Sequence, residues 1–88
     1  MAPVALRQNP RVVYRDLADG GVLLHLESGE YHSLNATGCE IWKLIDGQRT
    51  PGEIAGELRA KVDDAPADLD AVVSGFLRGL EERDLVVA

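Results

Sequence analysis

The sequence is short of cysteine and of positive charge. Its 88 residues include one cysteine, Cys39, which excludes an internal disulfide and any zinc cluster built from cysteines. No histidine lies near it in the sequence, so we expect a structural thiol that is buried or half-buried. A single cysteine without a disulfide also fits a reducing, cytoplasmic location. Lysine and arginine number 9 against 15 acidic residues, for a net charge of −6. Such a surface repels phosphate backbones and anionic lipids, which argues against nucleic acid or a membrane as partner.

Long hydrophobic runs are absent as well. No segment approaches the roughly 20 apolar residues needed to cross a bilayer. The first ten residues lack the apolar stretch of a secretory signal and contain Pro3 and Pro10, so we expect them to form a loose N-terminal segment. The chain is 45% hydrophobic, enough for a folded core. Its length suits a single domain over residues 1–88.

Groups that perform catalysis are sparse. The only two histidines are His25 and His32, and a structural zinc site needs four ligands. A two-residue turn at Ser28-Gly29 would place the histidines opposite each other on neighbouring strands. A three-residue turn beginning at Glu27 would instead place His32 opposite Leu24. No glycine-rich loop has the spacing of a phosphate cradle, so we expect no metal, no cofactor and no enzymatic activity.

The first half of the sequence contains three short strand-like segments. We predict strands at 12–14, 22–26 and 30–34, which are rich in residues that favour sheets. Glycine-containing turns at 19–21 and 27–29 separate them. This pattern is typical of an antiparallel meander whose first and third strands are edges.

Three helices are predicted to follow. Asn35 is a favoured N-cap for a helix that ends near Asp46-Gly47. The run Thr50-Pro51-Gly52-Glu53 forms a capping box at the start of the second helix. The third helix, Leu69–Leu80, carries a continuous apolar stripe, and the apolar tail at 85–87 could pack on the core or add a strand. The order predicts an α+β fold, winged helix-turn-helix-like, in which a three-stranded antiparallel sheet precedes three helices and the hairpins form the wing.

The third predicted strand is an unprotected edge. It contains neither lysine nor proline, the usual devices that prevent an edge from pairing with another chain. On the winged-helix plan the third helix runs beside it, so an extended peptide could add itself as a further strand. The alternative is an ordinary edge with the helix buried wholly in the core. Tyr31 and Phe76 are either core residues or the lining of one groove, and their spacing leaves both open.

Several short segments follow one another in the order and spacing of a known family. They are YHSLNATG at 31–38, Ile41-Trp42, Asp46-Gly47, Thr50–Leu58, Leu69–Leu80 and Asp84-Leu85-Val86. Together they resemble the signature of the pyrroloquinoline-quinone biosynthesis protein D (PqqD-like) family, over nearly the whole chain from Arg11 onward. The form is most similar to stand-alone members in lasso-peptide biosynthesis, which are recognition elements for ribosomally made, post-translationally modified peptides (RiPPs).

This resemblance implies a non-catalytic protein that captures the leader of a precursor peptide. In the family the leader docks as an added antiparallel strand beside the third strand and against the third helix. Apolar residues of both elements would contact it, and the carboxylate of Asp68 could pair with a basic leader residue. Spacing alone does not separate the helix residues that face the groove from those that face the core. The matching positions are Glu30, Tyr31, His32, Ser33, Asp68, Leu69, Val72, Val73 and Phe76.

The resemblance also implies partners. In lasso systems a separate leader peptidase, a cysteine protease of transglutaminase-like fold, acts on the captured precursor, and a macrolactam cyclase acts next. The main alternative is a winged-helix DNA-binding regulator. Its recognition helix should be basic. The third predicted helix and its flanks instead contain two basic residues, Arg78 and Arg83, and four acidic ones. The oligomeric state stays open, because an unprotected edge could pair with a second copy.

Overall fold

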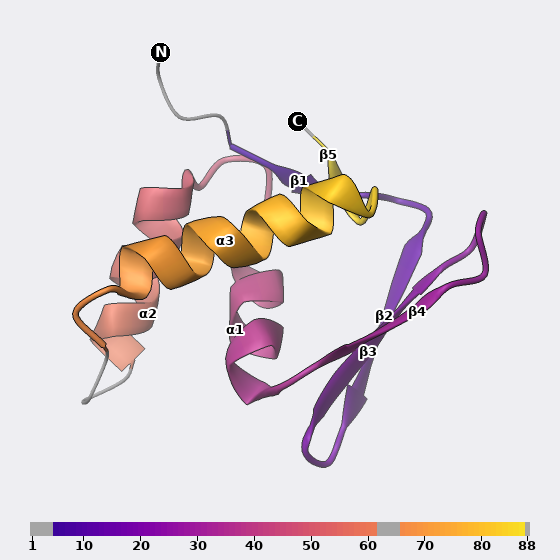
Figure 1. Ribbon diagram of the computed structural model, residues 1–88, viewed down its shortest axis with the longest axis horizontal. Helices are drawn as coiled ribbons and strands as arrows, with labels where there is room; N and C mark the ends of the chain where they lie inside the picture. Colours follow the sequence, from indigo (N-terminus) through magenta and orange to yellow (C-terminus); the bar gives the residue numbers. More distant parts are fainter. Residues whose placement is uncertain (1–4, 62–65, 88) are drawn as a thin grey trace.

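The computed structural model describes residues 5–61 and 66–87 (Figure 1). The strands are Arg7–Gln8 (β1), Val12–Leu17 (β2), Gly20–His25 (β3), Tyr31–Leu34 (β4) and Val86–Val87 (β5). The helices are Ala36–Leu44 (α1), Pro51–Lys61 (α2) and Leu69–Glu82 (α3). The predicted α+β architecture, a three-stranded antiparallel sheet followed by three helices, is confirmed.

The three-stranded sheet has the order β2-β3-β4, with both pairs antiparallel. Its helix-facing side packs on α1, which contacts β3 and β4 (Figure 1). The helices gather on this side of the sheet, and α3 packs mainly on α2. As predicted, β4 forms one edge of the sheet.

A second, two-stranded sheet joins the two ends of the described chain. Arg7 pairs with Val87 and Gln8 with Val86, so the apolar tail both adds a strand and packs on the core. The prediction of a loose N-terminal segment is wrong for residues 5–10, because Leu6 and Asn9 are buried beside this pairing. Residues 1–4 lie outside the described part. A strand of two residues is too short to show the alternation of apolar and polar residues by which strands are predicted from sequence.

The first hairpin turn is shorter than predicted. Asp19 lies in the turn, but the two glycines after it belong to β3, and Gly20 pairs with Leu17. Gly20 has a φ of +151°, and a β-carbon there would lie 2.1 Å from the carbonyl oxygen of Leu34. This glycine is therefore required by the close approach of β4 and its positive φ rather than by the turn itself.

The second hairpin turn is longer than either predicted alternative. The backbone N–H of His25 donates to the carbonyl oxygen of Glu30 at 3.0 Å, and the register places Leu23 opposite His32. Four residues therefore separate the paired positions, and both the two-residue and the three-residue turn are wrong. Gly29, with a φ of +74°, donates from its N–H to the His25 carbonyl at 2.7 Å. The two histidines are not opposite each other.

The helix start signals are confirmed. The Asn35 side-chain oxygen accepts a hydrogen bond from the backbone N–H three residues later at 2.7 Å. Thr50 and Glu53 form the reciprocal capping box, with the Thr50 N–H to Glu53 carboxylate bond at 2.9 Å and the return bond at 3.3 Å. The first helix ends earlier than predicted, since Ile45 is its C-cap and the positive-φ Gly47 lies two residues beyond.

The core lies between the sheet and the three helices. Trp42 is 2% exposed and stacks on the ring of Tyr14, with centroids 6.5 Å apart. Cys39 is buried, as predicted. No helix in the described ranges has the length and hydrophobicity needed to span a bilayer. The buried hydrophobic residues are Leu6, Leu23, Leu34, Cys39, Ile41, Trp42, Leu44, Ile45, Ile54, Ala55, Leu58, Leu69, Val73, Leu77, Leu80, Leu85 and Val86.

Candidate functional site

The free edge of β4 offers backbone hydrogen-bonding groups. In an antiparallel pair, successive residues alternate between bonding to the partner strand and facing away from it. The bond between His25 and Glu30 sets this alternation, so the backbone of His32 bonds to β3. The N–H and C=O groups of Tyr31 and Ser33 consequently face the free edge. Since β4 has one neighbour in the described sheet, these two residues can accept a further strand.

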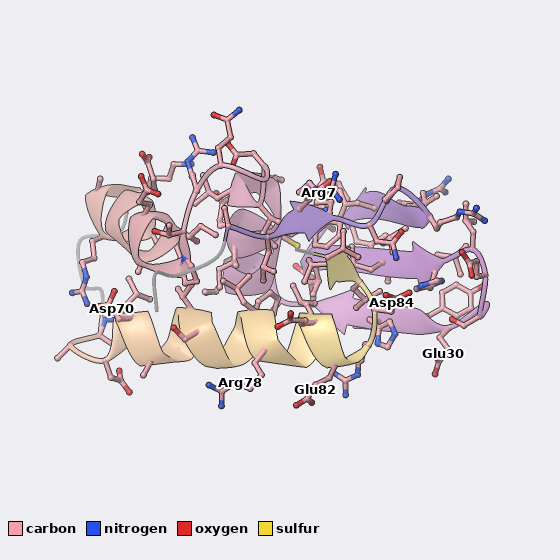
Figure 2. All side chains as sticks on the ribbon, turned by 90° about the horizontal axis from the view of Figure 1, so that it is seen from above. Arg7, Glu30, Asp70, Arg78, Glu82 and Asp84 are labelled. Atoms are coloured by element: carbon pink, nitrogen blue, oxygen red, sulfur yellow. The ribbon has the colours of Figure 1, made fainter. Side chains whose placement is uncertain are left out.

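The C-terminal half of α3 runs alongside this edge. Near the end of β4, a β-carbon on Gly38 would lie 3.2 Å from the ring of Phe76. Near the start of β4, Glu30 lines a depression together with Arg83 and Asp84, which follow the last turn of α3. Figure 2 shows the same arrangement, with Asp84 near Glu30. The helix and the strand thus form two walls, which we call the β4–α3 groove.

The apolar stripe of α3 divides between the core and this groove. Val73 is fully buried, whereas Val72 is 43% exposed and Phe76 is half-buried. On the far side of the helix, Asp70 accepts a hydrogen bond from Arg59 of α2 at 3.3 Å. Because successive helical residues are 100° apart, Val72 and Phe76 lie on the side turned away from α2, toward β4. Leu69, Val73, Leu77 and Leu80 point into the core.

This division resolves what the spacing left open. Leu69 and Val73, both expected as ligand contacts, are core residues with 5% and 0% exposure. Val72 and Phe76 face the groove. Asp68 is the N-cap of α3 and makes no side-chain capping bond. It lies beyond the end of β4, one helical turn before Val72, and so flanks the groove rather than lining it.

Tyr31 and His32 point to opposite faces of the sheet. His32 is opposite the buried Leu23, and Tyr31 is opposite Leu24. The Tyr31 side chain is 72% exposed on the face turned away from the helices, so it does not share a groove with the Phe76 ring. Its backbone, by contrast, lies at the groove edge. A shift of the β3–β4 register by one residue would place the Tyr31 side chain on the helix-facing side instead, because neighbouring strand residues face opposite ways.

The sequence did not indicate that a nitrogen of the His32 imidazole is buried without a hydrogen-bond partner among the described residues. The ring lies on the helix-facing side of β4, and the unpaired atom is its Nε2. Buried polar atoms are nearly always paired in folded proteins. An unpaired one beside an open strand edge is therefore a natural position for a ligand hydrogen bond.

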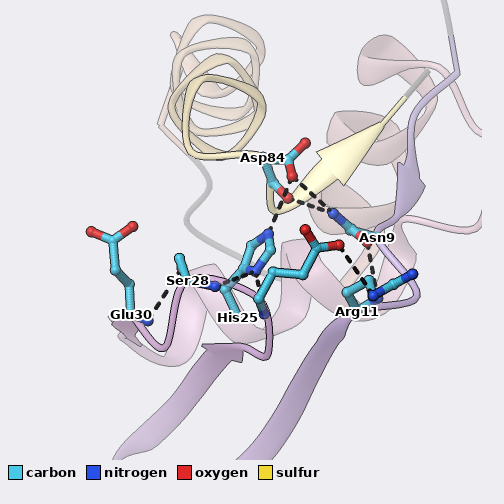
Figure 3. A network of polar contacts seen from close by, with 7 residues as sticks. Asn9, Arg11, His25, Ser28, Glu30 and Asp84 are labelled. Carbon is cyan, nitrogen blue, oxygen red and sulfur yellow. Dashed lines mark hydrogen bonds and ion pairs between the residues drawn. The ribbon is translucent and has the colours of Figure 1, made fainter.

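The depression at the Glu30 end of the groove has a volume of about 370 Å³. The imidazole of His25 lies against it and is almost fully buried, with Nε2 3.2 Å from Asp84 Oδ2 (Figure 3). The His25 Nδ1 accepts backbone N–H groups of the hairpin turn at 3.2 and 3.4 Å. The lining residues are His25, Glu27, Ser28, Glu30, Arg83 and Asp84.

The groups that line the β4–α3 groove are main-chain hydrogen-bonding groups and apolar side chains. Within the described residues, no group of three or more His, Cys, Asp or Glu side chains is arranged to hold a metal ion. The exposed charges in and around α3 are mainly acidic, which does not suit a DNA recognition helix. A free strand edge beside half-buried apolar side chains suits an extended peptide.

Comparisons with known proteins agree with this geometry. The model of the family described as coenzyme PQQ synthesis protein D (PqqD) matches residues 20–86. A solved structure of TbiB1 in complex with the TbiA(beta) leader peptide is 31% identical, with a TM-score of 0.78 over 91% of this chain and 93% of that chain. No curated protein matches the sequence.

Two more distant structures share the fold. Lasso peptide synthetase B1, complexed with the leader peptide, is 24% identical, with a TM-score of 0.80 over 96% of this chain and 99% of that chain. The heterocyclase TruD is 22% identical, with a TM-score of 0.67 over 96% of this chain. The match covers 11% of the TruD chain, so the fold occurs there as a small part of a larger protein.

Proposed function

The chain belongs to the coenzyme PQQ synthesis protein D family, and from this membership we propose that it binds the leader of a ribosomally made precursor peptide in the β4–α3 groove. The observation that carries the proposal is the free edge of β4 beside the exposed Val72 and the half-buried Phe76. The structure of a relative described as a leader-peptide complex supports it. The acidic surface of α3 gives no support to the alternative of a DNA-binding regulator.

The leader would bind as an antiparallel strand beside β4. Its main chain would bond to Tyr31 and Ser33, and alternate side chains would enter the groove against Val72 and Phe76. An antiparallel leader runs opposite to β4, so its C-terminal end leaves the groove near Glu30. Its N-terminal end passes toward Val72, where the carboxylate of Asp68 could pair with a basic leader residue.

The proposed role is delivery without catalysis. A disordered leader loses roughly 2–5 kcal/mol of its interaction energy on ordering, and the strand bonds and the groove contacts must exceed this. Holding the leader raises the local concentration of the adjoining cleavage site at a partner enzyme. We propose a separate leader peptidase, a cysteine protease of transglutaminase-like fold, as that partner, with a macrolactam cyclase acting next in a lasso-peptide pathway.

A titration with fluorescently labelled leader peptide tests the groove. The variant is Val72→Glu, because Val72 is exposed and tolerates substitution, whereas a charge at the fully buried Val73 would unfold the protein. The control is Ala71→Glu, which adds the same charge to an exposed position on the far side of α3. We expect saturable binding by the wild type and by Ala71→Glu, and affinity at least tenfold weaker for Val72→Glu.

Two outcomes would contradict the proposal. Equal affinity of Val72→Glu and the wild type would place the leader outside the groove. No saturable binding by folded wild-type protein, as checked by circular dichroism, would exclude recognition of that leader.

A further inference from the structure

The two walls of the β4–α3 groove belong to elements that make few direct contacts with each other. α3 packs mainly on α2 and on β5, and neither β3 nor β4 is among its principal neighbours. At one end of the groove, the ring of Phe76 lies close to Gly38 in the first turn of α1. At the other end, a side-chain contact between His25 and Asp84 joins the two walls (Figure 3).

His25 reaches both walls because its two ring nitrogens bond in different directions. Its Nε2 lies 3.2 Å from Oδ2 of Asp84, which comes two residues after the end of α3. Its Nδ1 accepts the backbone N–H groups of Glu27 and Ser28, at 3.2 and 3.4 Å, in the turn that leads into β4. The ring therefore connects the end of the helix wall to the start of the strand wall.

Asp84 is itself held in place. Its Oδ2 and its backbone carbonyl both accept hydrogen bonds from Asn9 Nδ2, at 3.3 and 2.8 Å. It follows directly on Arg83, the C-cap of α3. The carboxylate of Asp84 thus gives the His25 ring a fixed attachment point at the end of the helix wall.

The hydrogen bonds of His25 require a neutral ring. Two N–H groups donate to Nδ1, so this nitrogen carries no proton. In a neutral imidazole the proton is then on Nε2, which donates to the Asp84 carboxylate. A proton added at Nδ1 would turn this acceptor into a donor that faces two other donors. Protonation would therefore keep the contact with Asp84 and release the turn that leads into β4.

We propose that neutral His25 is a positioning residue for leader binding, which holds β4 at the distance from α3 that the leader requires. This role rests on the proposed function and concerns the same groove. A bound leader must bond to the free backbone groups of β4 at about 2.7–3.2 Å and contact Val72 and Phe76 at about 4.0–4.5 Å. Because both sets of contacts are short, a shift of about 1 Å between the walls would lose one of them.

Leader affinity should consequently depend on pH. Histidine is the side chain that changes its charge between about pH 5 and 8. Because the leader requires the neutral ring, affinity should be full at pH 8 and fall as the pH decreases. The second histidine, His32, lies on the groove side of β4 and needs its own control. The charged groups around the His25 ring are Asp84 and Arg83 after α3, Glu27 and Glu30 in the turn, and Arg11, which pairs with Glu27.

The first test compares Asp84→Ala with Asp84→Asn at pH 8. The probe is the fluorescently labelled leader of the precursor encoded in the same gene cluster. Alanine removes the attachment point of the ring, so we expect leader affinity at least fivefold weaker. Asparagine keeps an acceptor for Nε2, so affinity should stay within twofold of the wild type. The control is Thr50→Ala, which removes the cap of α2 and lowers stability away from the groove. It should leave leader affinity unchanged.

The second test is the profile of leader affinity from pH 8 to pH 5.5. We expect an at least fivefold loss over this range for the wild type and for His32→Gln. His25→Gln can still donate to Asp84, but it has no ring nitrogen for the turn and takes up no proton. It should bind the leader more weakly than the wild type at pH 8 and show no such loss on acidification. The nitrogen chemical shifts of the His25 ring, measured by NMR, should show a proton on Nε2 alone at pH 8.

Three results would overturn the positioning role and leave leader recognition intact. They are wild-type affinity of folded Asp84→Ala, a pH profile that His25→Gln leaves unchanged or that His32→Gln abolishes, and a His25 ring that carries its proton on Nδ1 at pH 8. Failure of the proposed function looks different. Folded wild-type protein would then show no saturable binding of the leader at any pH, and the positioning role would fall with it.

Discussion

The Nε2 atom of His25 lies 3.2 Å from Oδ2 of Asp84, a residue 59 positions later in the chain. The His25 side chain is 5% exposed and that of Asp84 is 69% exposed. The backbone carbonyl of Asp84 accepts a hydrogen bond from Asn9 Nδ2 at 2.8 Å. One residue thus connects the end of α3, the end of β3 and the link between β1 and β2 (Figure 3).

Loss of the Asp84 side chain should destabilise the fold. Asp84→Ala leaves the buried His25 Nε2 without its partner, which costs about 1–3 kcal/mol. Asp84 has a φ of +61°, a conformation that glycine adopts without strain. We therefore expect Asp84→Gly to be less destabilising than Asp84→Ala by about 1 kcal/mol. Asp84→Asn keeps an acceptor and tolerates this φ, so it should change stability least.

Urea unfolding of the three variants measures these differences. The expected order of stability is wild type, Asn, Gly and Ala. An alanine variant as stable as the wild type would mean that the contact with His25 contributes nothing. A glycine variant no better than alanine would mean that the backbone conformation at Asp84 is not strained.

Gly79 should make α3 less stable than alanine would, and should leave more room for the leader in the groove. It lies in α3 on the groove side, and a β-carbon there would meet only a terminal nitrogen of Arg83 at 4.0 Å. Glycine in a helix interior is about 1 kcal/mol less favourable than alanine. Gly79→Ala should therefore stabilise the protein by about that amount. Its methyl group would narrow the groove, so we expect weaker binding of the leader.

Gly56 supplies the matched control. It lies in α2 and is exposed, with no heavy atom within 4 Å of an added β-carbon. Gly56→Ala should stabilise the fold by a similar amount and leave leader affinity unchanged. Thermal unfolding and leader titration of both variants separate the two effects. Equal leader affinity of both variants would show that the leader does not approach Gly79.

Features set by local sequence could be predicted, whereas features set by distant contacts could not. The caps at Asn35 and at Thr50-Glu53 depend on residues three apart, and both were predicted. The role of Gly20 depends on the carbonyl of Leu34, which another strand supplies. The first turn was misplaced for this reason. The second turn is an exception, because its contacts are local. It spans four residues, and the backbone N–H of Glu27 within it donates to the imidazole of His25 two residues earlier.

The groove itself was predicted in outline but not in detail. An edge strand without lysine or proline is visible in the sequence, and β4 is that edge. The apolar stripe of α3 is wide, and neighbours such as Val72 and Val73 differ by only 100° around the helix. The packing of α2 decides which of them is buried. The face of Tyr31 likewise depends on a register that the sequence left ambiguous.

The carboxylate of Asp46 should stabilise the fold above acidic pH. Backbone N–H groups of Arg49 and Gln48 donate to it at 2.9 and 3.0 Å, and with the guanidinium of Arg49 they lower the pKa of Asp46 below its usual 3.8. A lowered pKa contributes stability that is present above the unfolded value and is lost as the pH falls through the folded value.

Asp46→Asn tests this dependence. We expect the variant to be less stable than the wild type at pH 7, with the difference shrinking as the pH falls below about 4. The control is Asp19→Asn, at an exposed turn position. Urea unfolding from pH 7 to pH 3 provides the comparison. A difference that stays constant over this range would assign the effect to the shape of the turn rather than to the charge.

The two histidines should respond in opposite ways to replacement by leucine. His25→Leu removes a ring whose two nitrogens are both bonded and leaves their partners unpaired, so it should destabilise the protein by about 1–3 kcal/mol. His32→Leu removes a buried Nε2 that has no partner in the described structure. Removing an unpaired buried polar atom is neutral or stabilising, so the free protein should keep or gain stability.

Leader binding should show what the His32 nitrogen is for. If the bound leader supplies its partner, His32→Leu weakens leader affinity by about two- to tenfold, because a hydrogen bond between neutral groups contributes about 0.5–1.5 kcal/mol. The unfolding midpoint of the free protein should stay the same or rise. His32→Gln, which restores a donor and an acceptor, should recover part of the affinity. If His32→Leu unfolds as readily as His25→Leu, the imidazole stabilises the free fold, and its nitrogen is not kept for a ligand.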